Sequence, residues 1–409
     1  MNEKKHLHIH QLNYFQCHRV FRILNHLFTI FMRNLLYLIT IFLNLPPVFG
    51  QKINFFAGTT NDSIGESVAI CQLDEDNSEI KLLNHLQGGK RPGYIVVAQD
   101  KKNLYAVSSQ KFEDKNPTHS VNAFLIVDQG LGLKLLNSRT SKGLNPCHVS
   151  INPMKNYVYA ANYNSGNIVC YKTDKRGRLS KPLCSIQHSG SGPVTGRQEG
   201  PHAHYIHASN DGRFVYAADL GIDRIMIYKQ EDAGKLIPNP GQEFLALTPG
   251  SGPRHMAFHA NEKWVFILTE LSSEVISCRV DKPTGRLEVV DIKKTIERED
   301  HPENFPAAIR IHPNGKYLYC SNRGANSIVL FEISEDGILT KKMSFRENIG
   351  TVRDFNISPS GNHLIAGNQD RNELVLFKID SDGTLQSTGS RIPTMEPSCV
   401  VFMEKQEED

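Results

Sequence analysis

A repeated segment constrains the fold of this chain more than any other feature. Each copy has a short apolar strand after Pro or Gly, a polar turn, a strand such as "KYLYCSN", a polar corner and a strand such as "SIVLFEI". These are β-branched and aromatic runs separated by turn residues. The clearest copies are residues 145–174, 200–230, 252–275, 305–334 and 351–380. A weaker copy covers residues 91–110, and a fragment covers residues 396–405.

The spacing of the copies predicts an all-β, seven-bladed β-propeller. A period of roughly 45–55 residues with several strands in each period is typical of propeller blades. Arrays of paired helices would need a helical periodicity, which the chain lacks. Seven first strands are expected, beginning near Pro92, Pro146, Pro201, Pro253, Pro306, Val352 and Pro397.

The seventh of these first strands, near Pro397, has no partner strands after it in the chain. The N-terminal part supplies three: "INFFAGT", "SVAICQL" and "IKLLNHL". We therefore expect the ring to be closed by N-terminal strands that complete the blade begun by the C-terminal strand. This closure pairs the edges that an open ring would expose. It makes residues 51–409 a single propeller domain.

Residues 1–50 form a predicted leader, with a signal peptide at about 32–50. Arg33 precedes the apolar run Leu35–Leu45, and the small residues Val48 and Gly50 precede Gln51. This order of charged, apolar and small residues is typical of secretory signal peptides. A start codon at Met32 would leave residues 1–31 untranslated. The pattern predicts export to the periplasm with no stable membrane insertion after cleavage, or a cytoplasmic protein if the leader is not functional.

The cysteines indicate neither a disulfide framework nor a metal site. Eight are present, none in a C-x-x-C pair, and Cys17 belongs to the predicted leader. The other seven lie mostly in apolar runs, where a free thiol behaves as a small hydrophobe. An odd number cannot all pair with one another, and exported proteins tend to pair theirs.

Composition and motifs exclude several classes of function. The net charge of +3 is spread along the chain, and no basic block with interleaved aromatics indicates nucleic-acid binding. No G-x-S-x-G, H-E-x-x-H or P-loop is present. The glycines of "SGSGPVTG" (189–196) lack dinucleotide-binding spacing and belong to a loop before His202. The sequence requires no metal or cofactor, and it does not indicate the oligomeric state.

Polar residues recur where the propeller topology brings them together. The start of a first strand and the end of a second strand meet on one face, at the mouth of the central channel. Arg254 and His255 begin a first strand, and Glu270 ends the next strand, so the three are expected to converge there. Equivalent positions in other blades hold His148, Asn162, Asn164, His202, His204, Asp219, Arg310, Asn322, Arg323, Arg353, Asn368 and Gln369. Tyr163 is the one aromatic of this predicted ring.

This ring suits a carbonyl or anionic substrate. Guanidinium groups bind carboxylate or phosphate through paired hydrogen bonds, and His and Glu transfer protons. A structural role competes with this interpretation, because polar side chains also satisfy backbone groups at strand ends. An internal Arg254–Glu270 salt bridge is the main structural alternative.

The stretch "GSGPRHMAFHANEKWVFILTELSSEV" (250–275) resembles the signature blade of the seven-bladed lactonase family, and "GPHAHYIHASNDGRFVYAADLGIDRIMIY", "NYNSGNI" and "RDFNISPSGNHLIAGNQ" resemble its neighbouring blades. That family includes propeller-type 6-phosphogluconolactonases and carboxymuconate cyclases, and the similarity covers nearly the whole chain after the leader. It implies lactone chemistry by a His, arginines and a Glu. Thr269 replaces the family's usual Asn before this Glu. Carried over by position, the catalytic candidates are His202 or His204, Arg254 and Glu270, and the substrate-binding candidates are Arg323 or Arg310, with His148 and Arg353 at further polar positions of the family. The ring positions themselves add Asn162 and His255 as substrate-binding candidates.

Three functions are therefore consistent with the sequence. The first is a 6-phosphogluconolactonase-like hydrolysis of a sugar lactone, in which water attacks the carbonyl. The second is a cyclase or isomerase acting on a carboxymuconate-type dicarboxylate, which needs the same residues. The third is a non-catalytic binding propeller, because fold does not fix function. The ring residues favour a small-molecule substrate, whether a sugar lactone or a related anion.

Overall fold

The computed structural model describes Met32 and residues 52–61, 68–109, 119–154, 156–297, 301 and 303–403. The predicted leader lies outside these residues apart from Met32. The propeller belongs to the compact unit that begins at Gln51. Among the described residues, no helix is long and apolar enough to cross a membrane.

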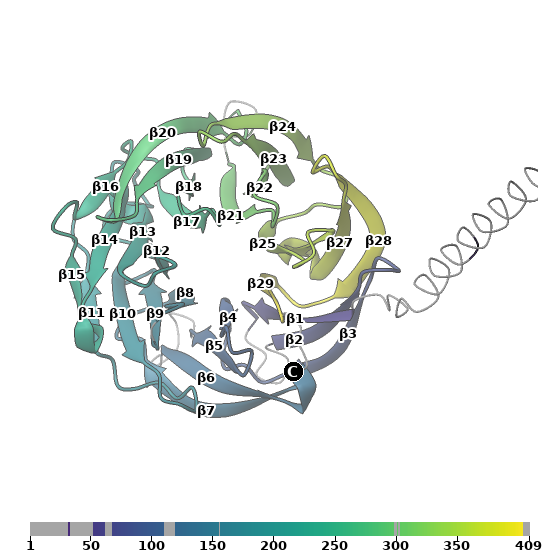
Figure 1. The fold of residues 1–409 in the computed structure, drawn as a ribbon, viewed down its shortest axis with the longest axis horizontal. Helices are drawn as coiled ribbons and strands as arrows, with labels where there is room; N and C mark the ends of the chain where they lie inside the picture. Colours follow the sequence, from purple (N-terminus) through teal and green to yellow (C-terminus); the bar gives the residue numbers. More distant parts are fainter. Residues whose placement is uncertain are drawn as a thin grey trace, which may run out of the picture. The chain divides into compact units, whose positions relative to one another are not determined.

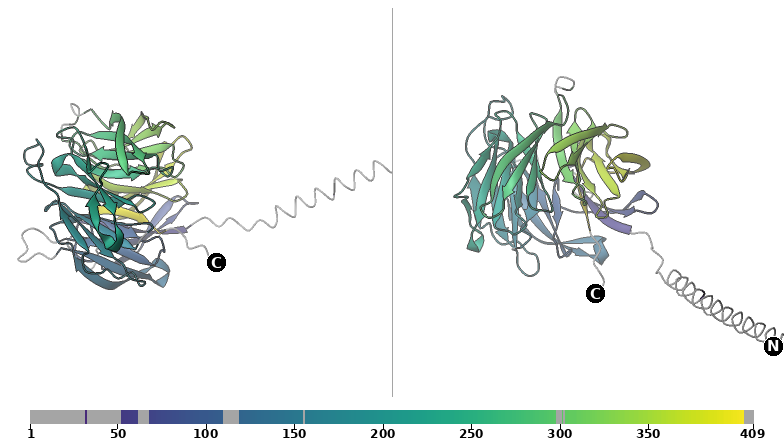
Figure 2. Two further views of the ribbon diagram at one scale, coloured as in Figure 1. Left: turned by 60° about the vertical axis from the view of Figure 1, so that its left-hand side comes forward. Right: turned by 45° about the horizontal axis from the view of Figure 1, so that its top comes forward.

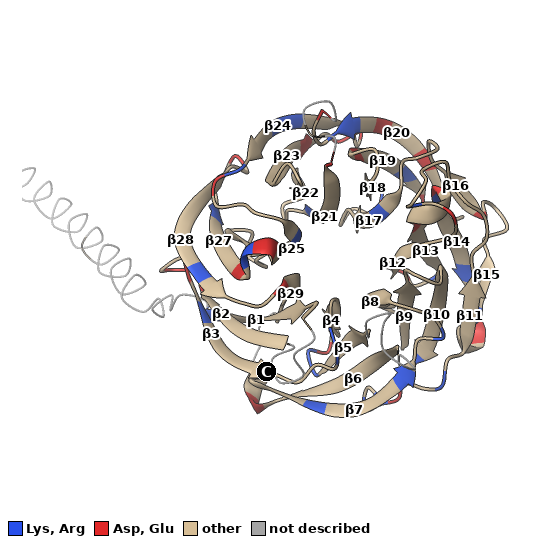
Figure 3. Ribbon diagram, turned by 180° about the vertical axis from the view of Figure 1, so that it is seen from behind, with Lys and Arg blue, Asp and Glu red and all other residues tan. Residues whose placement is uncertain are grey.

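Seven antiparallel sheets form a ring, which confirms the predicted seven-bladed propeller (Figure 1). In each blade the strands run in order from the channel to the rim. Two further views show the stacked sheets of the ring from oblique directions (Figure 2). Basic and acidic residues are interspersed around the outer strands rather than gathered by sign (Figure 3).

The strand bounds, from the channel outward in each blade, are as follows. The first sheet along the ring contains β4 (Ile95–Val97), β5 (Asn103–Ser108), β6 (Ser120–Val127) and β7 (Gly132–Thr140). The second contains β8 (Pro146–Ile151), β9 (Tyr157–Asn162), β10 (Asn167–Lys172) and β11 (Cys184–Gln187). The third contains β12 (Ala203–Ala208), β13 (Phe214–Asp219), β14 (Arg224–Gln230) and β15 (Leu236–Pro238). In the third of these sheets β16 (Phe244–Ala246) also pairs with β14.

The remaining four sheets each have four strands. They are β17 (Pro253–Phe258), β18 (Trp264–Thr269), β19 (Glu274–Asp281) and β20 (Arg286–Lys294); β21 (Phe305–Ile311), β22 (Tyr317–Arg323), β23 (Ser327–Ile333) and β24 (Leu339–Phe345); β25 (Val352–Ile357), β26 (His363–Asn368), β27 (Glu373–Ile379) and β28 (Leu385–Pro393); and β29 (Pro397–Phe402), β1 (Lys52–Thr59), β2 (Val68–Asp74) and β3 (Glu79–Leu86). The described helices are short 3₁₀ turns: η2 (Asp128–Gly130), η3 (Leu220–Ile222), η4 (Asp232–Gly234) and η5 (Gln369–Arg371).

The ring closes as the sequence predicts. The C-terminal strand β29 pairs antiparallel with β1, with Phe402 opposite Phe55 and Val400 opposite Ala57. Both phenylalanines belong to one buried apolar cluster shared with the neighbouring blade. The closing blade is therefore held by backbone pairing and by side-chain burial together.

Adjacent blades are joined by a contact that explains part of the repeat. The hydroxyl groups of Tyr105, Tyr216 and Tyr319 donate hydrogen bonds to turn glycine carbonyls in the next blade. The Tyr319 Oη to Gly383 O distance is 2.7 Å. Gly383 has a φ of 84°, a conformation that glycine adopts without strain. The recurring tyrosine of these second strands thus serves packing between blades.

Candidate active site

A cavity of about 590 Å³ opens at one end of the channel. Its lining is dominated by polar side chains, which explains why charged residues interrupt otherwise apolar strands. All seven blades contribute to it, through Thr60, Arg91, Gly93, Tyr94, Ser109, Asn145, Pro146, Cys147, Tyr163, Arg197, His204, Arg254, His255, Glu270, Arg323, Arg353, Gln369, Glu396 and Ser398. The predicted convergence of Arg254, His255 and Glu270 is present in this lining.

Backbone bulges place several of these side chains in the cavity. In β17, Pro253 pairs with Thr269 and His255 with Leu268, so Arg254 is an extra residue without a partner in the ladder. A bulge of this kind re-aims a side chain relative to the regular alternation. The same irregularity occurs near the start of other inner strands, at Cys147, His204, Arg353 and Ser398. All of these bulged residues line the cavity.

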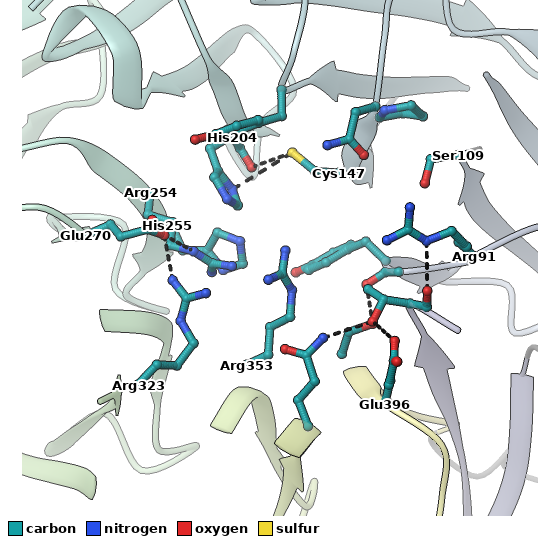
Figure 4. Close-up of a pocket in the computed structure, with 18 of the residues that line it drawn as sticks. Arg91, Ser109, Cys147, His204, Arg254, His255, Glu270, Arg323, Arg353 and Glu396 are labelled. Carbon is teal, nitrogen blue, oxygen red and sulfur yellow. Dashed lines mark hydrogen bonds and ion pairs between the residues drawn. The ribbon is translucent and has the colours of Figure 1, made fainter. Parts of the chain in front are cut away.

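Glu270 is the centre of a buried charge cluster (Figure 4). Its Oε2 lies 2.9 Å from Nε of Arg254 and 2.7 Å from Nη2 of Arg323. Its Oε1 lies 2.5 Å from Nη2 of Arg197. Burial raises the pKa of Glu270, but the charges of Arg323 and Arg254 lower it well below its ordinary value. Glu270 is therefore ionised and holds three arginines in place.

Arg254 is held on both sides. Besides its contact with Glu270, its Nη1 donates to the carbonyl of Ala307 in the next blade. The side chain is almost fully buried. Burial and the charge of Arg323 lower the pKa of Arg254, and Glu270 opposes them. The Arg254–Glu270 salt bridge that the sequence suggested is thus present, and it forms part of the cavity wall.

Arg353 differs from the other arginines of the cavity. No hydrogen bond or ion pair of its side chain occurs in the described part of the chain, and it projects between Arg323 on one side and Glu396 on the other (Figure 4). Burial and the charge of Arg323 lower its pKa. The lining holds five arginines and two glutamates, so positive charge is in excess. An anion would relieve this excess.

His204 and Cys147 lie side by side in the wall. The Cys147 Sγ is 3.9 Å from Nδ1 of His204 and donates to the carbonyl of Ala203 at 3.6 Å. Burial and the charge of Arg254 hold the pKa of His204 well below its ordinary value, so its imidazole is neutral. Burial raises the pKa of Cys147 to about 12, so its thiol stays protonated. His204 is thus a base in its proton-accepting form.

His202 is not part of the cavity lining. It precedes β12, its Nδ1 lies 2.8 Å from the carbonyl of Tyr163, and its ring stacks on that tyrosine at 4.5 Å. Its backbone N–H donates to Asp219. The sequence did not discriminate between His202 and His204. In the structure, His204 faces the cavity.

Stacked rings underlie the cavity. His148 lies between Tyr94 and Tyr205, with both ring centroids 4.3 Å away. His255 is 5.6 Å from His148 and 5.4 Å from His204. His255 and Tyr94 reach the lining, whereas His148 does not. His148 therefore supports the cavity from below.

Two further sequence candidates serve the framework. Arg310 is the sixth residue of β21, and its Nη2 lies 2.8 Å from Asp354. Asn162 is fully buried and donates to the carbonyl of Ser141 at 2.9 Å. Neither contributes to the lining. Arg310 lies beyond the mouth because it is four residues after Pro306, whereas Arg254 directly follows Pro253, so the position equivalent to Arg254 is Ala307.

Arg197 was missed from the sequence because it lies in the loop that starts at "SGSGPVTG" and follows no repeat position. Gln198 anchors this loop by donating to Asp223 at 2.8 Å and to the carbonyl of Leu220 at 2.7 Å. Asp223 also accepts from the backbone N–H of Gly252 at 2.7 Å. One buried carboxylate thus fixes both the loop of Arg197 and the start of the Arg254 strand. Arg91, Tyr94 and Cys147 were also not singled out.

Buried histidines predict a loss of stability in acid. Burial is the main cause that lowers the pKa values of His148, His204, His207 and His255. In the unfolded chain these values return to about 6.5. Below that pH the unfolded state binds more protons than the folded state, so the free energy of unfolding falls as the pH falls. We expect the histidines to make Tm decrease as the pH falls below about 6.5.

Thermal denaturation between pH 5.5 and 8 measures this effect. Glu270 does not contribute between pH 5.5 and 8, because its lowered pKa keeps it ionised in the folded state throughout this range. The variant His207→Gln removes one half-buried histidine with a lowered pKa outside the cavity lining and is expected to make the decrease shallower. A Tm that stays constant down to pH 5.5 would contradict the assignment of neutral histidines.

Comparison with known proteins gives the family. The model of the lactonase family described as "Lactonase, 7-bladed beta-propeller" matches residues 54–402. The 6-phosphogluconolactonase of Bacillus subtilis (strain 168) is 32% identical over 299 residues, which cover 72% of this chain and 81% of that protein.

Solved structures agree with this family. A Bacteroides fragilis NCTC 9343 crystal structure, provisionally named a 6-phosphogluconolactonase, has a TM-score of 0.80 and 27% identity, covering 87% of this chain and 99% of that one. The structure of the periplasmic gluconolactonase of Pseudomonas aeruginosa has a TM-score of 0.80 and 23% identity, and the match covers 86% of this chain and 99% of that one. This similarity supports the fold. The family model and the Bacillus relative together show that this chain belongs to the seven-bladed β-propeller lactonase family.

Proposed function

We propose that this protein hydrolyses an anionic sugar lactone in the cavity at the channel mouth, as a carboxylic ester hydrolase. The family and the name of the Bacillus relative support a lactone substrate. The observation that carries the proposal is the combination of a neutral His204 with the arginines around Glu270 and an unpaired Arg353. A base and fixed cations around one cavity are the groups that acyl transfer to water requires.

The reaction follows from the charges of these groups. His204 accepts a proton from water as the water oxygen attacks the lactone carbonyl. Arg254, held by Glu270 and Ala307, stabilises the negative charge that develops on the carbonyl oxygen. The ring C–O bond then breaks, and the leaving alkoxide takes the proton from His204. The product is the open hydroxy acid, whose carboxyl group releases its proton to solvent.

The charge excess favours an anionic substituent on the lactone. Arg353 has no anionic partner in the described protein, and Arg91 lies in the same lining, with its Nε 2.8 Å from the carbonyl of Thr60. Guanidinium groups bind phosphate through paired charge-assisted hydrogen bonds. We assign the side of the cavity with Arg353 and Arg91 to the phosphate or carboxylate of the substrate, and the side with His204 and Arg254 to the lactone ring.

The choice of base is tested by two matched substitutions. We expect His204→Asn to lower kcat by about 10²–10⁴, the usual contribution of a positioned general base. His202→Asn makes the same chemical change outside the lining and is expected to keep most activity. Hydrolysis is measured above the uncatalysed rate with glucono-δ-lactone and with its 6-phosphate. A larger loss in His202→Asn would reject this choice of base.

The substrate class is tested by product analysis. The purified protein is incubated separately with the phosphorylated lactone and with a carboxymuconate, and both mixtures are followed by NMR. We expect opening of the lactone and no change in the muconate. Turnover of the muconate alone would favour the cyclase function instead, and turnover of neither would favour a binding protein.

We also propose that the chain is exported and cleaved after Gly50. The support is Arg33, the apolar run Leu35–Leu45 and the small residues Val48 and Gly50. The expected result is a mature protein that starts at Gln51 in N-terminal sequencing of natively expressed material. An intact leader on protein recovered from the cytoplasm would contradict export and favour an intracellular lactone.

A further inference from the structure

Two cysteines face each other across neighbouring strands, away from the cavity. Cys170 on β10 is the register partner of Cys184 on β11. Paired residues of antiparallel strands point to the same face of the sheet. Cys170 is fully buried in an apolar cluster, and the half-buried Cys184 packs against that cluster. The two thiols are therefore neighbours at the outer edge of one blade.

The separation suits a covalent link. Directly opposed residues in an antiparallel ladder have Cα atoms about 4.5–5.5 Å apart, within the range of about 4.4–6.8 Å seen for disulfides. No other described cysteine has a cysteine as its register partner, because Cys71, Cys278, Cys320 and Cys399 pair with other residue types and Cys147 lies at a bulge. The pair is thus distinct among the described thiols.

The environment also distinguishes the two sulfur atoms. A hydrogen bond from Cys170 lowers the pKa of Cys184 to about 7. The same hydrogen bond, together with burial, raises the pKa of Cys170. The thiolate is the reactive form of cysteine, so the more accessible sulfur, that of Cys184, is the nucleophile.

We propose that Cys170 and Cys184 form a reversible cross-strand disulfide by exchange with a low-molecular-weight disulfide such as oxidised glutathione. The Cys184 thiolate attacks one sulfur of the oxidant, and one glutathione thiolate leaves. The Cys170 thiol then loses its proton and displaces the second glutathione from Cys184. Two protein thiols are oxidised, one disulfide is reduced to two thiols, and the Sγ–Sγ bond forms between β10 and β11.

The bond would fix the outermost strand of its blade. β11 has four residues and is held only by β10 in its sheet. The residue after it, His188, leads into the loop that carries Arg197 to Glu270. Closing the short segment from Cys170 to Cys184 restricts the unfolded chain. From that restriction we expect a rise in Tm of about 3–5 °C for a chain of this size.

The experiment uses the full-length protein, reduced or incubated with oxidised glutathione, then alkylated and digested with trypsin. Lys172 and Arg178 place the two cysteines in different tryptic peptides. The expected result is a disulfide-linked pair of these peptides in the oxidised sample, and a higher Tm before digestion. Cys184→Ser should show neither change. Cys278→Ala, a substitution at a cysteine in another blade, should keep both.

Several outcomes would overturn the proposal. Separately alkylated Cys170 and Cys184 in the oxidised sample would show that the bond does not form. A mixed disulfide of Cys184 with glutathione that persists would show that Cys170 cannot complete the exchange. A linked peptide pair without a rise in Tm would overturn the claim that the bond stabilises the blade.

Discussion

Glu270→Gln is expected to lower kcat/KM for lactone hydrolysis by about 10²–10⁴, a loss of the order seen when one catalytic or oxyanion-stabilising group is removed. The substitution keeps the shape of the side chain and removes the charge that holds Arg254, Arg323 and Arg197. Those arginines would then repel one another, and the oxyanion site would lose its geometry. Stability should also fall by about 3–5 kcal/mol, because a buried ion cluster loses its only anion.

Glu396→Gln is the matched control. Glu396 is the other glutamate of the lining, and its Oε2 accepts a hydrogen bond from Thr60 at 2.9 Å. It makes no ion pair with an arginine within the described residues. We expect this variant to keep activity within about threefold and stability within about 0.5 kcal/mol. Steady-state kinetics and urea denaturation of both variants give the comparison. Full hydrolysis by Glu270→Gln would reject the proposed site.

Arg353→Met is expected to stabilise the fold while impairing the enzyme. The substitution removes a half-buried charge without a partner and fills a similar volume, so we expect a small gain in the free energy of unfolding. Loss of a charge-assisted hydrogen bond to the substrate anion should raise KM for the phosphorylated lactone by about 10–100-fold. The neutral lactone lacks that anion, so its kinetics should change little.

Arg323→Met provides the opposite case. The chemical change is the same, but Arg323 is paired with Glu270 at 2.7 Å, so its loss should destabilise the protein. Chemical denaturation of the two variants should therefore give shifts of opposite sign. Shifts of the same sign would contradict the distinction between a paired and an unpaired arginine. Equal effects on the phosphorylated and neutral lactones in Arg353→Met would reject its role in binding the anion.

The repeat was sufficient to predict the fold, because its turns and strands recur at each blade. The closure by β29 and β1 followed from counting strands, and the structure confirms it. Arg254, Glu270 and Arg323 were placed together for the same reason, since topology brings the ends of the first two strands of a blade to one face.

Local backbone geometry explains what the sequence did not reveal. His202 and His204 are two residues apart and would share a face in a regular strand. β12 begins at Ala203 and bulges at His204, so His202 lies outside the strand and His204 faces the cavity. Arg197 comes from a loop whose path depends on Gln198 and Asp223, a contact between distant residues that no periodicity encodes.

The bulges of the inner strands have a consequence for how such enzymes diversify. A residue that pairs with no neighbour in the ladder can be replaced without breaking a backbone pair of the sheet. Its replacement nevertheless changes the chemical groups that contact a bound molecule. Cys147, His204, Arg254, Arg353 and Ser398 occupy such positions. The scaffold thus offers several substitution points around one ligand, of which Arg254 is coupled to Glu270 and Cys147 to His204. Combinatorial libraries restricted to these positions would explore new substrates while leaving the ring itself intact.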